Sequence, residues 1–323
     1  MRILVTGAAG YIGSVLVKQL LDKKFKVVGL DSLHFGGESL LPVYNHPHFT
    51  FIKEDIRNDD IVRQVIDEVE SVVHLAAIVG DPACANQPDL AREVNWNASK
   101  ELFDLCKANA NIKRFIFAST CSNYGKMEGN EYVTETSPLS PVSLYAELKV
   151  KFEKYILENQ MRYNLSTTAL RFATVYGLSP RMRFDLTVNE FMKEVTLGRE
   201  LQIFGEQFWR PYCHVEDLSR SVVQVLEAPA NKVANNVFGV GDTSENYQKK
   251  MLAEEIFKIV PDGIIRYVQK DEDPRDYRVD FSKIKKELGY SITKRVPDGL
   301  REIHDAIKYK IINDPDDRRY SNI

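Results

Sequence analysis

Over the first 120 residues, short runs of apolar and β-branched residues alternate with longer segments in which apolar residues recur at helical spacing. The short runs predict five strands: RILVTG, KVVGLD (Lys26–Asp31), FTFIKED, SVVHLA and RFIFAST. The longer segments predict helices at Tyr11–Lys23, Ile56–Val69 and Leu90–Ala108. Strands that are apolar on both faces need cover on both faces. The pattern therefore predicts an α/β fold, a doubly wound parallel sheet between two layers of helices.

The same pattern continues with a helix at Pro141–Tyr163 and a strand at Ser166–Phe172, and it loosens after Gly177. The later segments predict a smaller α/β lobe with helices at Leu186–Leu197, Val215–Leu226, Ser244–Ile259 and Pro297–Lys310, and short strands near Leu201 and Ile264. The run Asn235–Val240 predicts a strand that returns to the main sheet. We therefore predict a main domain of residues 1–177 with a return segment at about 208–240, and a second lobe of residues 178–207 and 241–323.

The composition is that of a globular protein: 323 residues, 44% of them hydrophobic, with 43 Lys and Arg against 46 Asp and Glu. The net charge of −3 and the lack of a long basic stretch argue against nucleic acid or an anionic membrane as a partner. The four cysteines form no CxxC pair, and the six histidines show no ligand spacing, so no metal site is expected. We expect no signal peptide and no membrane span, and hence a cytoplasmic protein.

The segment TGAAGYIG (Thr6–Gly13) stands where the first predicted strand gives way to the first helix. In this context Gly7 permits the tight turn, Gly10 lets the backbone approach a diphosphate, and Gly13 allows the helix to pack closely on the strand. Tyr11 and Ile12 open the helix, whose N-terminal N–H groups attract an anion. The segment predicts a Rossmann-type site for a dinucleotide.

Asp31 ends the second predicted strand, 18 residues after Gly13. A carboxylate at this point accepts hydrogen bonds from both ribose hydroxyls and repels a 2′-phosphate. The next residues, Ser32 and Leu33, bring no arginine for that phosphate. We therefore predict NAD, rather than NADP, as the cofactor.

Tyr145 and Lys149 lie four residues apart on a predicted helix, so both side chains project from one face. A phenol is a poor base at neutral pH. We expect the nearby ammonium and the positive nicotinamide ring to lower the pKa of Tyr145, so that it can take a proton from a hydroxyl group. In a dinucleotide-binding chain, the pair therefore makes Tyr145 a candidate base for a hydroxyl proton.

Several motifs together resemble the extended short-chain dehydrogenase/reductases, in the nucleotide-sugar epimerase/dehydratase family. The resemblance covers essentially the whole chain. It rests on TGAAGYIG, Asp31, Asp55 with Ile56, HLAA (His74–Ala77), STCSNYG (Ser119–Gly125), Tyr145 with Lys149, LRFATVYG (Leu170–Gly177) and RPYCHVEDL (Arg210–Leu218).

The resemblance implies roles for further residues. Thr120 falls where the family has its catalytic Ser or Thr, and Lys149 anchors the nicotinamide ribose. The cofactor contacts implied are Asp55 and Ile56 at the adenine, Leu75, Ala76 and Ala77 at the ribose and phosphates, Asn95, and Phe172 at the nicotinamide. The sugar contacts implied are Thr120, Ser122 and Thr174.

A nucleotide sugar brings a second diphosphate, and planar guanidinium groups suit phosphate oxygens. The candidates are Arg181, Arg183, Arg210 and Arg275, with Asn189 contacting the diphosphate or sugar from the smaller lobe. Residues 178–207 and 241–323 are accordingly predicted to bind the substrate. The resemblance also implies a homodimer, formed through the helices Leu90–Ala108 and Pro141–Tyr163.

Departures from the family pattern narrow the reaction. Sugar 4,6-dehydratases carry Asp and Glu directly after the catalytic Thr, whereas Cys121 and Ser122 stand here. The 3,5-epimerases use a Cys where this chain has Ser122, and Cys121 is out of that register. The prediction is an NAD-dependent epimerase that oxidises C4 to a ketone and reduces it again. A 4-dehydrogenase or 4-ketoreductase acting on a hexose or heptose stays open as the alternative, and a non-catalytic NAD-sensing regulator as a minor one.

Overall fold

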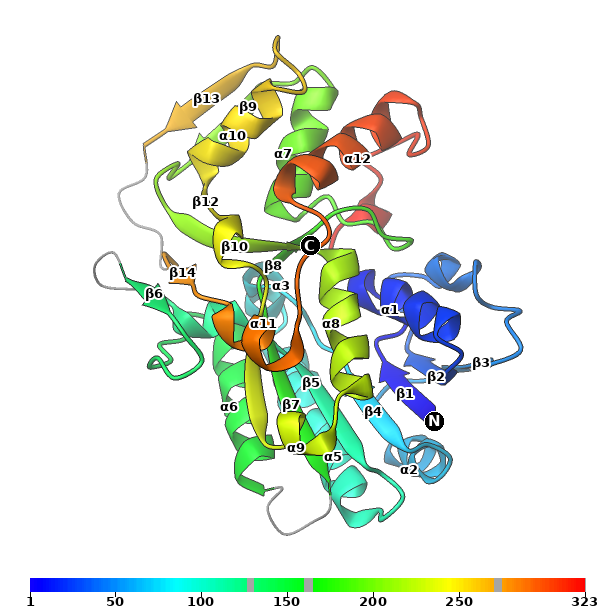
Figure 1. Cartoon of the computed structure of the whole chain (residues 1–323). Coiled ribbons are helices and arrows are strands. Elements are labelled where there is room, and N and C mark those ends of the chain that lie inside the picture. Colours follow the sequence, from blue (N-terminus) through cyan, green and yellow to red (C-terminus); the bar gives the residue numbers. More distant parts are fainter. Residues whose placement is uncertain (127–130, 160–164, 270–274, 323) are drawn as a thin grey trace.

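In a computed structural model, the chain forms two lobes that meet near the label C in Figure 1. The structure describes residues 1–126, 131–159, 165–269 and 275–322. The end of the predicted helix Pro141–Tyr163 therefore lies outside the described residues, and the described part of this helix is α6 (Leu144–Asn159).

The larger lobe is built on a sheet of seven strands in the described part of the chain, and every pairing within it is parallel. In spatial order the strands are β11 (Asn236–Val240), β7 (Ser166–Phe172), β5 (Arg114–Thr120), β4 (Ser71–His74), β1 (Arg2–Thr6), β2 (Lys26–Asp31) and β3 (Phe49–Lys53). The doubly wound α/β fold predicted from the sequence is confirmed. The strand order reverses on either side of β1, and ligands bind at such a switch point, beyond the carboxyl ends of the strands.

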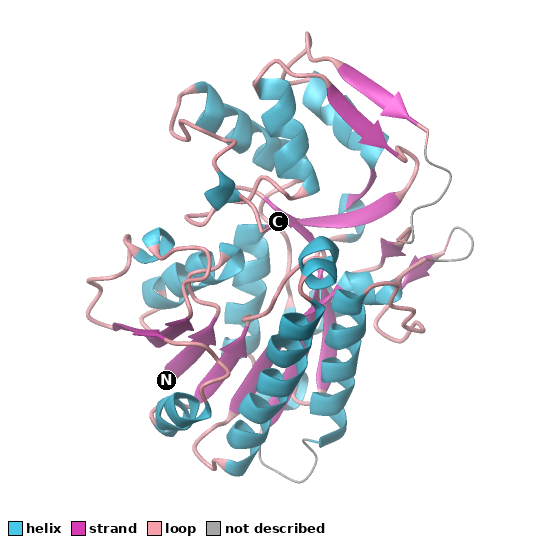
Figure 2. Cartoon of the chain, turned by 180° about the vertical axis from the view of Figure 1, so that it is seen from behind, coloured by secondary structure: helices cyan, strands magenta, loops and turns pink. Residues whose placement is uncertain are grey.

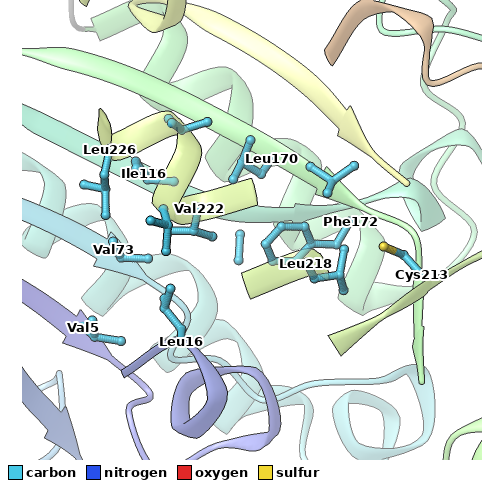
Figure 3. Close-up of a cluster of buried hydrophobic side chains, with 14 of the residues drawn as sticks. Val5, Leu16, Val73, Ile116, Leu170, Phe172, Cys213, Leu218, Val222 and Leu226 are labelled. Carbon is cyan, nitrogen blue, oxygen red and sulfur yellow. The ribbon is translucent and has the colours of Figure 1, made fainter. Parts of the chain in front are cut away.

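Helices cover both faces of this sheet (Figure 2). Ile3 and Val5 of β1 pack toward α1 (Tyr11–Asp22) and α8 (Val215–Glu227), whereas Leu4 packs toward the opposite layer. Figure 3 shows part of the first cluster, in which Leu16 of α1 and Val222 of α8 lie over the sheet. The opposite layer contains α2 (Asp59–Asp67), α5 (Ser99–Ala108) and α6. Because successive side chains of each strand point into opposite apolar layers, the strands appear in the sequence as continuous apolar runs.

The smaller lobe has its own buried cluster, which includes Val188, Leu252 and Leu300. Its helices are α7 (Thr187–Thr196), α10 (Lys249–Phe257) and α12 (Val296–Lys308). In this lobe β9 (Leu201–Phe204) pairs with β13 (Ile265–Val268). A second sheet has β10 (Trp209–His214) in the middle, between β12 (Asn246–Gln248) and β8 (Thr174–Tyr176). The remaining elements are β6 (Tyr132–Val133) with β14 (Arg278–Val279), and the short helices α3 (Asp81–Asn86), α4 (Pro88–Arg92), α9 (Ala230–Val233) and α11 (Ser282–Leu288).

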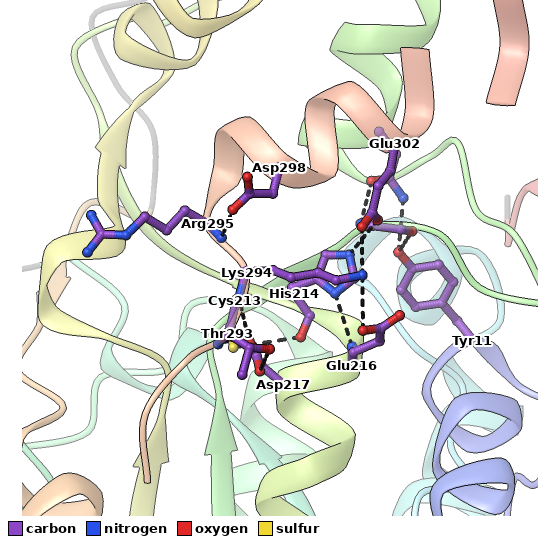
Figure 4. Close-up of polar contacts among 12 residues, drawn as sticks. Tyr11, Cys213, His214, Glu216, Asp217, Thr293, Lys294, Arg295, Asp298 and Glu302 are labelled. Atoms are coloured by element: carbon purple, nitrogen blue, oxygen red, sulfur yellow. Dashed lines mark hydrogen bonds and ion pairs between the residues drawn. The ribbon is translucent and has the colours of Figure 1, made fainter. Parts of the chain in front are cut away.

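Polar contacts join the two lobes beside the first helix (Figure 4). The Tyr11 hydroxyl donates to the carbonyl oxygen of Gly177 and accepts from Asn189 Nδ2 at 3.1 Å. His214, fully buried, lies 3.0 Å from the Glu302 carboxylate of α12. These contacts hold the start of α1 against the end of β8. They thereby fix the position of the segment after β8, which lies over the carboxyl ends of the main strands.

Two predicted helices differ from the observed elements. In the segment predicted as a helix at Ser244–Ile259, residues 246–248 form β12, because the Asn246 side chain bonds both backbone groups of Val279 and draws the chain into a strand. The helix predicted at Leu90–Ala108 contains a π-helical turn at Glu93–Ala98 before α5. There the Ser99 hydroxyl donates to the Val94 carbonyl at 2.8 Å.

Candidate functional site

A cavity of about 530 Å³ lies at the carboxyl ends of the main strands. Its floor consists of those strand ends and the turns that follow them. Its roof includes Thr174, Val175, Arg181, Arg183, Asp185, Leu186, Thr187, Arg275, Tyr277 and Asn322. Predicted site residues that line this single cavity are Gly7, Gly10, Tyr11, Ile12, Gly13, Asp31, Asp55, Ile56, Leu75, Ala76, Ala77, Thr120, Ser122, Tyr145, Lys149, Phe172, Thr174, Arg181, Arg183 and Arg275.

The glycine loop has the geometry of an anion cradle. Gly7 has a positive φ of 73° and its N–H donates to the Leu30 carbonyl at 2.9 Å, which ties the turn to β2. A Cβ atom on Gly13 would lie 2.0 Å from the Gly7 carbonyl oxygen, so only glycine fits there. Gly10 is the N-cap of α1 and makes no side-chain cap, which leaves the start of the helix open toward the cavity.

Asp31 is held rigidly at the end of β2. Its Oδ2 accepts from Ala9 N–H at 3.0 Å and its Oδ1 from Leu33 N–H at 2.8 Å. Burial raises the pKa of this carboxyl, and the two backbone N–H groups oppose that shift. The side chain thus joins the glycine loop to the β2 turn and faces the cavity, where sugar hydroxyls can reach it.

The other predicted cofactor contacts surround this loop. Asp55 lies 2.8 Å from Arg57, whose hydrogen bond lowers the pKa of the carboxyl. The backbone N–H of Ala76 donates to Thr6 Oγ1 at 3.3 Å, and this hydroxyl also bonds His74 at 2.8 Å. Burial lowers the pKa of His74 to about 3, so the ring is neutral and serves as a structural link.

Tyr145 and Lys149 project from α6 into the floor, beside Thr120 at the end of β5. The Lys149 ammonium donates to the Ala118 carbonyl at 2.7 Å and lies 5.8 Å from the centre of the Tyr145 ring. Thr120 Oγ1 accepts from Ser122 N–H at 3.1 Å, so its own proton remains available to a ligand. The three predicted catalytic residues are brought together.

The expected acidity of the phenol is not found in the chain itself. Burial raises the pKa of Tyr145 above its usual value, and the neighbouring Cys84 and Asp81 raise it further. Burial also lowers the pKa of Lys149 to about 8, which weakens the cation meant to stabilise a phenolate. In the chain alone, Lys149 therefore does not make Tyr145 acidic, and the prediction for the chain with a bound nicotinamide ring stays a prediction. A positive cofactor ring stays the predicted source of that acidity.

Beneath the floor lies a buried ion pair that sequence reasoning missed. Glu153 of α6 lies 2.6 Å from Arg171 of β7, and both side chains are almost fully buried. Glu153 also accepts from Ser119 Oγ at 2.5 Å. These three residues neighbour the functional ones: Glu153 is one turn beyond Lys149, Ser119 precedes Thr120, and Arg171 precedes Phe172. A charged residue on the buried face of α6 was the available signal.

Three predicted residues are absent from the lining of the cavity. Asn95 bonds both backbone groups of Ile78 at 2.8 and 2.9 Å and so supports the turn after β4. Asn189 bonds Gly177, Tyr11 and Arg183 at the junction between the lobes. Arg210 lies 5.4 Å from the ring centre of Tyr277, which itself lines the cavity. The structure thus places all three behind residues of the cavity wall.

The arginines of the roof are partnered to different extents. Arg183 pairs with Asp185 at 2.5 Å, and Arg275 lies 3.2 Å from Asp81. Arg181 has no carboxylate partner among the ion pairs of the described residues, and burial lowers its pKa to about 10. Lining residues that sequence reasoning did not single out include Phe35, Asp81, Tyr277 and Asn322.

Within residues 1–126, 131–159, 165–269 and 275–322, no helix combines the length and apolar character needed to cross a bilayer. The same ranges contain no group of three or more His, Cys, Asp or Glu side chains arranged to hold a metal ion.

The family model described as "NAD dependent epimerase/dehydratase family" matches residues 3–241. The uncharacterized UDP-glucose epimerase YtcB of Bacillus subtilis is 33% identical over 314 residues, which cover 93% of this chain and 96% of that protein.

Among solved structures, UDP-glucuronic acid 4-epimerase from Bacillus cereus in complex with NAD is 30% identical with a TM-score of 0.83, covering 96% of this chain and 99% of that one. The dTDP-glucose 4,6-dehydratase DesIV from Streptomyces venezuelae, with NAD bound, is 27% identical with a TM-score of 0.85, covering 96% and 98%. Similar proteins thus include both epimerases and a dehydratase.

Proposed function

The chain belongs to the NAD-dependent epimerase/dehydratase family, and we propose that it is a nucleotide-sugar epimerase acting through transient oxidation at C4 of the sugar. The observation that carries the proposal is that one cavity joins the glycine loop and Asp31 to Tyr145, Lys149 and Thr120. The residues present fit NAD, because the start of α1 at Gly10 is open toward the cavity and Asp31 faces the cavity as an acceptor. The close approach of Gly13 to the Gly7 carbonyl, which a Cβ would prevent, keeps this loop tight.

In this proposal Tyr145 takes the proton of the sugar C4 hydroxyl and later returns it. Thr120 donates a hydrogen bond to the same oxygen, and Lys149 holds the ribose of the nicotinamide half while anchored on the Ala118 carbonyl. When bound, NAD supplies a hydride acceptor and donor for C4. The enclosed position of Tyr145 on the cavity floor, where Asp81 also acts on it, keeps the phenol protonated until a positive charge comes beside it.

The surroundings of Thr120 support epimerisation over dehydration. The Cys121 thiol is fully buried and donates to the Arg171 carbonyl at 3.2 Å, on the side away from the cavity lining. Burial raises the pKa of this thiol well above its usual value, so it is no acid or base at neutral pH. Ser122, which does line the cavity, has no ionisable group. The two residues that follow Thr120 thus supply no acid–base pair for the loss of water.

The experiment incubates the protein with UDP-glucose or UDP-glucuronic acid, with NAD far below the sugar nucleotide, and follows the sugar by NMR and NADH by absorbance. The expected result is many turnovers to the 4-epimer for each NAD. Accumulation of NADH in step with a keto sugar would instead identify a dehydrogenase, and a 6-deoxy product would identify a dehydratase. Either outcome overturns the proposal.

The proposal includes a homodimer formed through α5 and α6, as the family resemblance implies, and a place in the cytoplasm, where nucleotide sugars and NAD are available. Sedimentation of the purified protein tests the dimer: a monomer at micromolar concentration contradicts it.

A further inference from the structure

Arg181 is a buried cation whose hydrogen bonds are incomplete. Arg181 is 6% exposed, and among the described residues its buried Nε and Nη1 atoms have no hydrogen-bond partner. Only Nη2 donates, to the Ser321 carbonyl at 3.1 Å, and the guanidinium lies 4.5 Å from the centre of the Phe35 ring. An unpaired buried charge is costly, and such groups are ordinarily completed by a partner of opposite charge. Because Arg181 lines the cavity, that partner is expected to be a ligand.

The position of Arg181 shows which part of a ligand it meets. Ser179 Oγ donates to the Tyr11 carbonyl at 2.7 Å, and Arg181 N–H donates to Ser179 Oγ at 3.3 Å, so the backbone of Arg181 is fastened to the start of α1. On the other side, Ser39 Oγ donates to the Ala9 carbonyl at 2.7 Å and holds the loop that carries Phe35 against the glycine loop. Arg181 therefore lies over the glycine loop.

Along the cavity, Arg181 stands between the two ends of the cofactor site. Phe35 follows the strand that ends at Asp31, at the predicted ribose position. In the opposite direction, Arg183 and Asp185 follow Arg181 along the roof and line the same cavity as Tyr145. A dinucleotide that reaches from Asp31 to Tyr145 has its diphosphate in the middle, beside Arg181.

A second unpaired group completes this wall. Asn322 lines the cavity, and its Oδ1 is buried without a partner. Its segment is fastened to the roof, because Phe184 N–H donates to the Tyr320 carbonyl at 2.8 Å and the two rings pack with centres 5.7 Å apart. In Figure 1 the chain returns to the junction between the lobes at this point. The Asn322 oxygen can accept a hydrogen bond from a hydroxyl group, and the Arg181 guanidinium can donate to a phosphate. The two groups together suit a ligand that has both.

We propose that Arg181 binds the diphosphate of the dinucleotide from the side opposite the glycine loop, with residues 320–322 covering it. Arg181 thus belongs to the cofactor subsite and not to the second diphosphate, for which the sequence suggested it. The inference rests on the NAD dependence in the proposed function and on none of its sugar chemistry. It also predicts slow release of the cofactor, since residues 320–322 must lift before a clamped diphosphate can leave.

The test measures binding by calorimetry in Arg181→Gln, with NAD, ADP-ribose and UDP as probes. NAD and ADP-ribose are expected to bind about 10- to 100-fold more weakly, which corresponds to about 1.4 to 3 kcal/mol for charge-assisted hydrogen bonds. UDP binding is expected to stay unchanged. Arg301→Gln, at an exposed arginine of α12, is the matched control and should change none of the three affinities.

Two results would overturn the inference: unchanged binding of ADP-ribose, or a loss confined to UDP, which would return Arg181 to the substrate. Asn322→Ala provides a second variant that leaves Arg181 in place, and faster dissociation of NAD is expected from it. These measurements need no turnover. If the protein binds NAD through Arg181 but epimerises no sugar, the proposed function fails and this inference stands.

Discussion

The floor and the roof of the cavity each contain a buried arginine, Arg171 below the strand ends and Arg181 among the covering residues. Arg171 donates from Nε and Nη2 to Glu153, and from Nη1 to Tyr124 and to the Glu135 carbonyl. Arg181 has two nitrogens without partners. Arg171 is therefore fully paired within the chain itself, whereas Arg181 is complete only with an anion present.

This difference separates two tasks. A paired Arg171 and Glu153 beneath the floor support Tyr145, Lys149 and Thr120 before any ligand arrives, as a catalytic site requires. In the roof, by contrast, the unpaired Arg181 is stabilised when an anionic ligand binds. We therefore expect the roof to close over the cavity only when the ligand is present. The following variants test this division, from the largest expected effect to the smallest.

Tyr145→Phe removes the proposed base from the floor. Turnover is expected to fall about 1,000-fold, in the range of general acid–base catalysis, while the affinity for NAD stays within a few-fold. Steady-state kinetics and calorimetry measure the two quantities. Tyr155→Phe, on the same helix but bonded to Asp104, serves as the control and should retain turnover. If Tyr145→Phe lost turnover and NAD affinity to the same extent, the division of catalysis and cofactor binding between floor and roof would be contradicted.

Arg171→Met leaves the Glu153 carboxylate buried without its cation. The free energy of unfolding is expected to fall by about 3 to 5 kcal/mol, because breaking one half of a buried ion pair is strongly destabilising. Urea denaturation followed by circular dichroism measures it. The double variant Arg171→Met with Glu153→Met should recover part of the loss. A single variant as stable as the wild type would show that the floor does not depend on this pair.

Lys149 gives the floor a pH dependence. Its pKa is lowered from 10.5 to about 8 by burial, so between these values the unfolded chain binds more protons than the folded one. Burying the charged ammonium therefore lowers the free energy of unfolding by up to about 3 kcal/mol below pH 8. As the pH rises from 8 to 10.5, this penalty disappears and the protein becomes more stable. The measurement is the difference in unfolding free energy between the wild type and Lys149→Met at several pH values. A difference that falls or stays constant from pH 8 to 10.5 contradicts the burial argument.

Arg181→Met replaces the unpaired cation of the roof by an apolar side chain. In the absence of nucleotide, the free energy of unfolding is expected to stay within about 1 kcal/mol of the wild type, since little paired interaction is lost. The same denaturation assay as for Arg171→Met gives the comparison. A loss of stability as large as that of Arg171→Met would mean that Arg181, like Arg171, is already paired within the chain.

Much of the floor could be predicted because its signals are local. The strand Ser166–Phe172 has the predicted bounds, and the glycine loop joins β1 to α1 as its spacing indicates. Tyr145 and Lys149 lie on one helix, so helical geometry alone puts them together. Asn189 and Arg210 were harder to place, because their partners at the junction between the lobes are distant in sequence. The helix predicted at Ser244–Ile259 failed in its first residues for the same reason, since Asn246 pairs with Val279.

The sequence by itself determined the parallel sheet, the glycine cradle and the pairing of Tyr145 with Lys149, because periodicity and short spacing encode contacts within a strand, a turn or a helix. Only the tertiary structure decided the protonation of these groups and the state of the two arginines. Burial raises the pKa of Tyr145, and Arg181 meets Ser321 across 140 residues. Desolvation and charge pairing depend on what surrounds a side chain in space, and no local pattern records that.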